Sequence, residues 1–254
     1  MKTLFLVAGA SKGLGKEVSI QLKSKDSEVI IAARGLDKLN DLAQRHDLLP
    51  LSFDGTDFDS TLFLAKSVLE RYRKKDFERL VVVFAADMHE PASIIDRGVK
   101  RFTVEADFSE KYINKARRLS VESPVKLFDH LNESDVNLSF VYISSNAANA
   151  KFWNKGNSVY GKNKRAAELE FDSKEGAYCL RFGFIYTDMS TKLLKELEGL
   201  DSGVHVDNNI SNPLVKAEDV FLEAREVAKD IKSFIHGERD NFCIVSGNIF
   251  EYIG

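Results

Sequence analysis

The sequence is poor in cysteine and proline and carries almost no net charge. Its 254 residues include two cysteines and four prolines, and 36 Lys and Arg stand against 39 Asp and Glu. Cys179 and Cys243 form neither a CxxC motif nor a Cys/His pattern, which argues against a disulfide framework and a zinc site. The cysteine content therefore predicts a reducing, cytoplasmic location. The charge balance argues against nucleic acid or an anionic membrane as a partner.

The sequence also lacks metal-ligand spacing, long apolar runs and flexible linkers. Its five histidines are scattered, so we assign no metal site. The apolar run at residues 4–8 is too short for a signal sequence or a membrane span. No Ser/Gly-rich stretch or repeat divides the chain, and 44% apolar residues suffice for one large core. We expect a single domain over residues 1–254 that binds a small molecule.

Short apolar runs alternate with amphipathic segments along most of the chain. The alternation predicts an α/β fold, a Rossmann-type doubly wound parallel sheet of about seven strands with helices on both faces. The expected strands are residues 4–8, 29–33, 49–53, 80–86, 138–143, 178–182 and 242–245. The expected helices are residues 14–23, 36–45, 60–73, 124–131, 160–171 and 217–235. Residues 87–118 are ambiguous, and residues 190–213 are expected to form a loop over the ligand.

A glycine-rich turn follows the first expected strand directly. It reads Gly9-Ala-Ser-Lys-Gly13-Leu-Gly15 and leads into an amphipathic helix. Glycines let the backbone approach a pyrophosphate closely, and the free amides at a helix N-terminus attract anions. The GxxxGxG spacing differs from the general dinucleotide fingerprint, GxGxxG. The alternative is a turn that uses glycine for steric reasons only.

Tyr160 and Lys164 stand four residues apart at the start of an expected helix, and therefore on one face. A neighbouring ammonium stabilises a phenolate, which lowers the tyrosine pKa from about 10 and allows acid/base catalysis. Ser144 and Ser145 end the expected strand 138–143 and could hydrogen-bond an oxygen on which charge develops. The alternative is a surface tyrosine beside a solvated lysine.

Together these motifs resemble those of the short-chain dehydrogenases/reductases. The turn that starts at Ala8 is similar to the family's TGxxxGxG motif, with alanine in place of threonine, and the segment from Arg181 is similar to its RPGxxxTxM motif. The resemblance implies that the chain interconverts a carbonyl and an alcohol by hydride transfer. It makes Ser145 the polarising hydroxyl, Tyr160 the acid/base, and Lys164 the group that lowers the tyrosine pKa and binds the nicotinamide ribose.

The resemblance also implies a dinucleotide cofactor, and the residues after the second strand favour NADP(H). Ala33 stands where an NAD-preferring member carries an acid, and Arg34 and Lys12 flank the expected 2′-phosphate. The alternative is that both cations are ordinary surface charges. Asp54 resembles the family's acid that contacts the adenine ring. The alternative use of the acidic pair Asp54 and Asp57 is a helix N-cap at Asp57. The expected cofactor-binding residues are Gly9, Ser11, Lys12, Gly13, Leu14, Gly15, Arg34, Asp54, Ala85, Tyr160, Lys164, Ile185 and Thr187.

Several features depart from the family pattern. The fourth strand ends in Phe-Ala-Ala-Asp87 in place of NNAG, and Ser120 occupies the position of the usual catalytic asparagine. The interval between Ser145 and Tyr160 is longer than usual, so the catalytic serine could instead be Ser144. The short stretch between Lys164 and residue 181 makes the family's homodimer doubtful, since that helix often builds the interface.

Two alternatives to an enzyme are open. The altered NNAG and asparagine positions would suit a catalytically weak NADP(H)-binding sensor, and the fold could also serve only as a scaffold. Retention of Ser145, Tyr160 and Lys164 favours the enzyme. The chain length and the loop with Phe152 and Trp153 resemble sepiapterin and benzil reductases, which reduce carbonyls on aromatic or bicyclic substrates.

Overall fold

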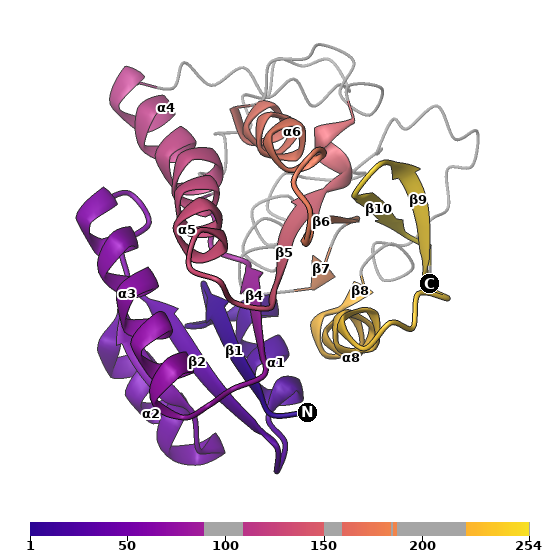
Figure 1. The fold of residues 1–254 in the computed structure, drawn as a ribbon. Helices are drawn as coiled ribbons and strands as arrows, with labels where there is room; N and C mark the ends of the chain where they lie inside the picture. The colour runs from indigo at the N-terminus through magenta and orange to yellow at the C-terminus, as the bar shows by residue number, and fades with distance from the viewer. Residues whose placement is uncertain (89–108, 150–158, 184, 187–221, 254) are drawn as a thin grey trace, which may run out of the picture.

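A computed structural model of the protein describes residues 1–88, 109–149, 159–183, 185–186 and 222–253 (Figure 1). Its centre is an eight-stranded sheet in the order β3-β2-β1-β4-β5-β6-β10-β9. Neighbouring strands are parallel except for β9, which runs antiparallel to β10. The sheet consists of β1 (Thr3–Ala8), β2 (Ser27–Ala33), β3 (Leu49–Ser52), β4 (Arg79–Phe84), β5 (Leu138–Ser145), β6 (Ala177–Phe182), β9 (Phe242–Ser246) and β10 (Ile249–Tyr252). A separate parallel pair consists of β7 (Ile185–Tyr186) and β8 (Leu222–Glu223).

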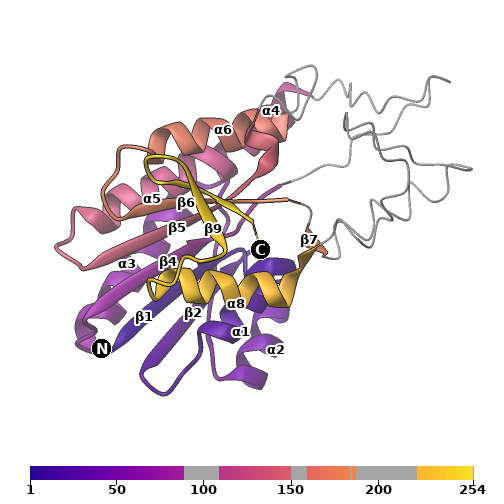
Figure 2. The ribbon, with the colours of Figure 1, turned by 90° about the vertical axis from the view of Figure 1, so that its right-hand side faces the viewer.

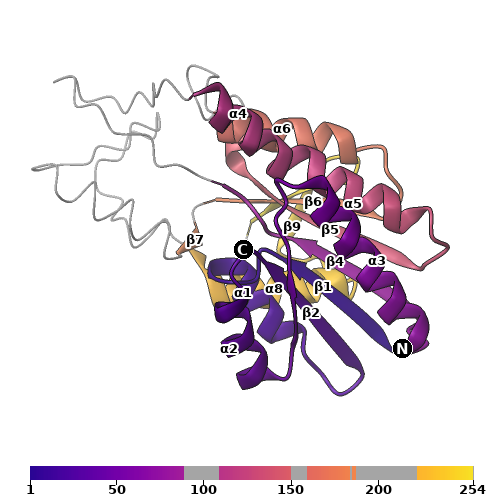
Figure 3. The same cartoon turned by 90° about the vertical axis from the view of Figure 1, so that its left-hand side faces the viewer.

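Helices cover both faces of the sheet, as Figure 2 and Figure 3 show from opposite sides. One face carries α1 (Gly13–Leu22), α2 (Leu36–His46) and α8 (Ala224–Ile235). The other face carries α3 (Phe58–Lys74), α5 (Ser123–Asn132) and α6 (Val159–Phe171). A short helix, α4 (Glu110–Arg117), continues into α5 through a π-helical turn, η1 (Arg118–Glu122), and a 3₁₀ turn, η2 (Asn146–Ala148), follows β5. Within the described residues, no helix is long and apolar enough to cross a membrane.

Each strand contributes side chains to two separate cores. In β1, Leu4 and Leu6 pack toward α3 and α5, whereas Phe5 and Val7 pack toward α1 and α8. This alternation follows from the period-two geometry of a strand whose two faces are both covered, so β1 is buried throughout and apolar from Leu4 to Ala8. The two cores therefore fix the register of the sheet, because a one-residue slip would exchange them.

Aromatic rings fill much of the core beneath α5 and α6. Phe140 stacks on Phe171 with ring centroids 5.3 Å apart, and Phe128 meets Phe140 edge-on at 5.6 Å. Tyr142 lies 5.6 Å from Phe171. Such pairs contribute about 0.5–1.5 kcal/mol each beyond the burial of their area. This cluster anchors α6 against β5, the two elements that carry Tyr160 and the serine pair.

The structure confirms the doubly wound sheet and corrects two of its predicted elements. The predicted strand at residues 242–245 is the antiparallel edge strand β9, and β10 takes the parallel position beside β6. A two-residue turn, Gly247-Asn248, separates them, and Gly247 has φ +44°. The predicted helix at residues 217–235 begins at Ala224, after β8. Its first residues, 217–221, lie outside the described part of the chain.

The ambiguous segment at residues 87–118 contains α4. Its first turn is capped by Ser109, whose hydroxyl accepts a hydrogen bond from the backbone N–H of Tyr112 at 3.3 Å. The expected loop at residues 190–213 lies outside the described residues.

Candidate active site

The predicted site residues gather at the carboxyl ends of β1, β4 and β5. Ala8 pairs in register with Phe84, and Phe84 pairs with Tyr142, so β1 and β4 end at the same level and β5 continues to Ser145. The helix after β1 packs on one face of the sheet and the helix after β4 on the other (Figure 3). The crevice between such strands is where ligands bind in doubly wound sheets.

The turn after β1 requires glycine at Gly9 and Gly15, the first and third glycines of the motif. Gly9 has φ +89°, and a Cβ there would lie 2.5 Å from the backbone nitrogen of Ala86. A Cβ on Gly15 would overlap the carbonyl oxygen of Gly9. Gly13 has φ +57° and begins α1. The turn therefore brings three backbone segments closer together than any side chain would allow.

The N-terminus of α1 presents backbone amides to this turn. Lys12 is its N-cap residue and gives no side-chain hydrogen bond to the helix. The amides of the first helical turn have no intrahelical partner, so they favour an anion. Lys12 is exposed and Ser11 is half-buried, whereas Leu14 packs into the core. The predicted cradle is thus assembled, with the exposed Lys12 at its rim.

Asp54 and Asp57 both have defined roles in the turn after β3. Asp54 accepts hydrogen bonds through Oδ1 from the backbone nitrogen and hydroxyl of Thr56, at 2.9 and 2.8 Å. Asp57 caps α3 by accepting from the nitrogen of Asp59 at 3.0 Å, so its capping role is confirmed. Partial burial alone raises the pKa of Asp54, but the Thr56 hydrogen bonds and the charges of Arg34 and Lys115 lower it below its ordinary value.

Arg34 is exposed directly after β2, where the sequence places it beside a cofactor ribose. Its charge acts on Asp54, together with that of Lys115 on α4. Lys115 has no place in the family motifs, and only the packing of α4 brings it here. The turn after β3 therefore lies near two cations.

Asp87 is the departure from the family pattern with the largest effect on the site. Its Oδ2 lies 2.6 Å from Nζ of Lys164, and its Oδ1 accepts a hydrogen bond from the Ser120 hydroxyl at 2.8 Å. The nitrogen of Met88 donates to the same Oδ1 at 2.7 Å. The side chains of Asp87 and Lys164 are only 12% and 4% exposed. Ser120 and Asp87 thus form one buried chain of contacts that ends on Lys164.

Lys164 is held from three sides. Its ammonium donates to the carbonyl oxygen of Ile143 at 2.6 Å and lies 4.7 Å from the ring centroid of Tyr142. The Tyr142 hydroxyl in turn donates to the carbonyl oxygen of Ser120 at 2.8 Å. Burial alone would lower the pKa of Lys164, but Asp87 raises it well above its ordinary value. Lys164 is therefore an ammonium at every physiological pH.

Tyr160 does not have the lowered pKa that its spacing from Lys164 predicts. Burial raises its pKa, Lys164 lowers it, Asp87 raises it again, and a hydrogen bond with Ser145 lowers it. The net direction is upward, although Nζ of Lys164 lies 5.5 Å from the ring centroid. The expected effect of the ammonium is present, but burial and the neighbouring carboxylate outweigh it.

The two serines at the end of β5 have different partners. Ser144 donates a hydrogen bond to Oε1 of Glu168 at 2.7 Å and is only 3% exposed. Glu168 also accepts from Nε and Nη2 of Arg181, both at 2.7 Å, so its carboxylate binds the guanidinium at two points. Ser145 is the serine that hydrogen-bonds Tyr160, and its hydroxyl also accepts from the nitrogen of Ala147 at 3.2 Å.

The structure therefore brings Ser145, Tyr160 and Lys164 together. Of the predicted cofactor-binding residues, Ala85 is held against β1 by a 2.9 Å hydrogen bond from its nitrogen to the oxygen of Ala8. Ile185 lies in β7. Thr187 lies outside the described residues, as do Phe152 and Trp153.

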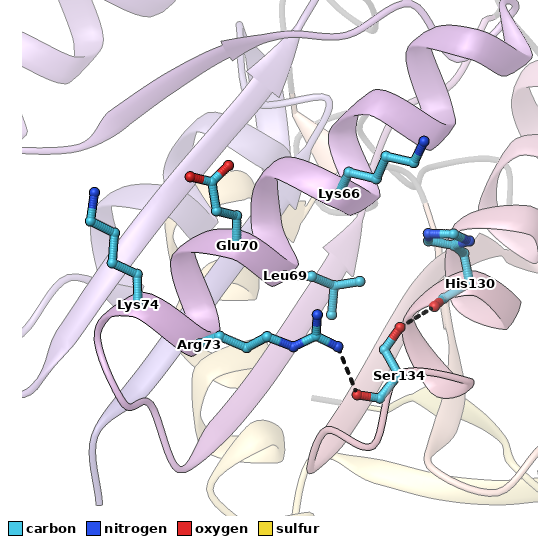
Figure 4. Close-up of a pocket in the computed structure, with 7 residues that line it drawn as sticks. All are labelled: Lys66, Leu69, Glu70, Arg73, Lys74, His130 and Ser134. Carbon is cyan, nitrogen blue, oxygen red and sulfur yellow. Dashed lines mark hydrogen bonds between the residues drawn. The ribbon is translucent and has the colours of Figure 1, made fainter.

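A cavity elsewhere on the surface contains none of the predicted site residues. It has a volume of about 630 Å³ and lies between α3 and the C-terminal end of α5 (Figure 4). Its lining residues are Lys66, Leu69, Glu70, Arg73, Lys74, His130 and Ser134. Arg73 spans it by donating to the carbonyl oxygen of Ser134 at 3.4 Å. Three of these residues, Lys66, Arg73 and Lys74, are cations, and Glu70 is an anion.

The sequence itself matches no family model and no curated protein. Solved structures do match its fold. A short-chain dehydrogenase/reductase from Mycobacterium ulcerans superposes with a TM-score of 0.73 at 20% identity, over 99% of this chain and 88% of that one. An actinorhodin polyketide ketoreductase with NADPH gives 0.70 at 14% identity, over 98% and 95%. A ribose-5-phosphate isomerase from Brucella melitensis 16M gives 0.71 at 16% identity, over 99% and 91%.

At these identities the likeness concerns the fold. Because one of the three structures is described as an isomerase, the fold alone does not define the reaction. The resemblance to sepiapterin and benzil reductases is not supported by these structures. The order of the strands, the glycine turn after β1 and the structural matches agree on one conclusion. The chain has the fold of the short-chain dehydrogenases/reductases.

Proposed function

We propose that this chain is an NADPH-dependent short-chain dehydrogenase/reductase that interconverts a carbonyl and an alcohol. The observation that carries the proposal is the meeting of Ser145, Tyr160 and Lys164 at the sheet edge beside the glycine turn. A single domain, a cytoplasmic location and a small-molecule substrate are further predictions from the sequence. We make no proposal for a homodimer.

The residues around the turn fit a dinucleotide. Gly9 and Gly15 allow the tight turn, because a Cβ on either would overlap backbone atoms of this chain, and the amides at the start of α1 suit a pyrophosphate. Arg34 and Lys12 are exposed cations at the ends of β2 and of the turn, which suits a 2′-phosphate. The actinorhodin ketoreductase of the same fold was solved with NADPH. When bound, the nicotinamide supplies the hydride.

The catalytic residues would divide the remaining work. Ser145 and Tyr160 share a hydrogen bond, so a carbonyl oxygen placed between them would accept from both hydroxyls. Tyr160 would then donate its proton to that oxygen as the carbonyl carbon is reduced. Lys164 stabilises the phenolate left behind, and its fixed ammonium would bind the nicotinamide ribose.

Cofactor preference is tested by thermal-shift titration with NADPH and NADH. A charge-assisted hydrogen bond to phosphate is worth about 1.5–3 kcal/mol, so Arg34→Ala should weaken NADPH binding about tenfold to a hundredfold. NADH binding should be unchanged. The matched control is Arg45→Ala, because Arg45 is an exposed arginine in the last turn of α2. No shift with either nucleotide would refute the proposal.

Turnover is tested on a panel of carbonyl substrates with the better cofactor. Tyr160→Phe should abolish reduction and leave NADPH binding within about threefold, because the phenol donates the proton but holds little of the dinucleotide. Tyr72→Phe, a change on α3 away from the site, should keep full activity. A thermal shift without turnover on any carbonyl would favour the alternative, a weakly catalytic NADP(H)-binding sensor.

A further inference from the structure

The ion pair between Asp87 and Lys164 has no counterpart in the family motif, which has glycine at the position of Asp87. We propose that Asp87 is a positioning residue that fixes Lys164 and cancels its charge, so that Tyr160 is kept as a proton donor and the site favours carbonyl reduction at neutral pH. The proposal deepens the proposed function and depends on it for the reaction. The effect of Asp87 on Tyr160 itself does not depend on any activity.

The ion pair fixes the position of the Lys164 ammonium. A lysine side chain has four rotatable bonds, and a catalytic lysine needs its Nζ in one place. Here Nζ is bound at 2.6 Å by both Oδ2 of Asp87 and the oxygen of Ile143. Asp87 is itself fixed by the Ser120 hydroxyl at 2.8 Å. Two strand ends and η1 thus define the position of the ammonium.

The ion pair also changes the charge that acts on Tyr160. An isolated ammonium beside a phenol stabilises the phenolate, but an ammonium in contact with a carboxylate forms a pair with no net charge. Both members are buried, at 4% and 12% side-chain exposure, so water screens them little. The carboxylate therefore offsets part of the effect of the ammonium on Tyr160.

The other groups around this pair do not restore the missing positive charge. From β5, Tyr142 faces Lys164 with its ring, and from β6 the Cys179 thiol lies close enough to feel the ammonium. From η1, Ser120 offers an uncharged hydroxyl. One helical turn further along α6, Glu168 is already paired with Arg181. Among the described residues, Asp87 and Lys164 are the charged groups that act on Tyr160.

The consequence lies in the direction of the reaction. Reduction needs the Tyr160 phenol, whose proton goes to the carbonyl oxygen as the hydride adds to the carbon. Oxidation needs the phenolate, which takes the proton from the alcohol. Below the tyrosine pKa, the phenolate fraction falls about tenfold for each pH unit. An ammonium paired with a carboxylate thus holds the reduction-competent phenol over a wider pH range than an unpaired ammonium would.

The test compares Asp87→Asn with wild type by titrating Tyr160 in the protein without substrate. The signal is the Cζ chemical shift of ¹³C-labelled tyrosine, assigned with Tyr160→Phe. Removing a carboxylate from a buried site should lower the titration midpoint of Tyr160 by about one pH unit. The low-pH limb of alcohol oxidation should move by the same amount, and oxidation at pH 7 should rise about tenfold. Reduction at pH 7 should change less.

Asp129→Asn is the matched control, because Asp129 on α5 also pairs with a lysine. Its Oδ1 lies 2.5 Å from Nζ of Lys174. It should leave the Tyr160 midpoint unchanged. Ser120→Ala removes the hydrogen bond to Asp87 but keeps the charge, so it should also leave the midpoint within about 0.3 unit. If Ser120→Ala moves the midpoint as far as Asp87→Asn does, the role of Asp87 is structural and the proposal fails.

Asp87→Ser is the second variant in case Asp87→Asn does not fold, because the smaller side chain leaves room for water beside Lys164. An unchanged or higher Tyr160 midpoint in either folded variant overturns the proposal. The titration separates this proposal from the proposed function: if wild type binds no NADPH, the function fails while the midpoints still decide the role of Asp87. If wild type reduces carbonyls and the midpoints do not differ, the function stands and the role of Asp87 falls.

Discussion

Replacing Glu168 by glutamine should destabilise the protein more than any surface charge substitution. The Glu168 side chain has no exposed area, and that of Arg181 is 5% exposed. The carboxylate accepts two hydrogen bonds from the guanidinium and a third from Ser144. In Glu168→Gln, the amide would keep one acceptor oxygen, but its NH₂ would face at least one Arg181 donor, and the buried guanidinium would lose the carboxylate that binds it at two points.

The magnitude follows from the geometry of this pair. Unit charges about 4 Å apart interact by about 4 kcal/mol at an effective dielectric constant of 20. Mutational experience gives about 3–5 kcal/mol for breaking a buried pair by removing one partner. For a chain of this size, such a loss corresponds to a fall in Tm of roughly 10 °C. It is also a large fraction of the total stability of a typical domain.

Urea unfolding followed by circular dichroism measures this loss. The matched control is Glu226→Gln, because Glu226 pairs with Lys229 at 2.8 Å but both side chains are at least half exposed. That exposed pair should contribute about 0.2–1 kcal/mol. Replacing both buried partners, as in Glu168→Leu with Arg181→Met, should recover more than half of the loss, because no charge is then left unpaired. A loss for Glu168→Gln no larger than that of the control would refute this reasoning.

Two further predictions test the turn and the thiols. Gly9→Ala should abolish NADPH binding and lower stability, because its Cβ would lie 2.5 Å from the nitrogen of Ala86 at a φ of +89°. Thermal-shift measurements with and without cofactor report both effects. A stable variant that binds NADPH as wild type does would contradict the prediction. Cys243 is exposed, whereas burial raises the pKa of the Cys179 thiol, so a thiol-reactive chromophore should label one cysteine rapidly in the native protein and two in urea. Rapid labelling that survives in Cys243→Ser would show that the buried thiol is accessible.

Much of the architecture could be predicted because it depends on local patterns. The apolar runs at β1 and β2 and the amphipathic helices between them follow from the periodicities of strands and helices. The glycine turn was also predictable, since the positive φ at Gly9 is a local requirement. The C-terminal hairpin is not among the predicted elements although Gly247-Asn248 is a recognised two-residue turn, because the short run at residues 242–245 has the pattern of a complete final strand.

The environment of Lys164 could not be predicted in the same way. Asp87, Ser120 and Lys164 come from three distant parts of the sequence, and only the packing of the sheet and η1 brings them together. The spacing of Tyr160 and Lys164 predicts their proximity, but it says nothing about the burial and the third charge that together outweigh the effect of the ammonium on the tyrosine pKa. Which of the two serines is available to Tyr160 likewise depends on Glu168, because Ser144 already donates its hydrogen bond to that carboxylate.

The pairing of β6 with β10 has a consequence for how the protein is made. Cys179 and Leu180 find their partners, Ile249 and Phe250, only after residues 183–248 have been synthesised. Until then β6 is an open sheet edge of buried, apolar residues, and contacts between such distant segments form slowly. Arg181, which orders the serine end of β5 through Glu168, lies on that strand. The end of the sheet that carries the candidate site should therefore be among the last parts of the protein to become native during translation, and the most dependent on protection from aggregation.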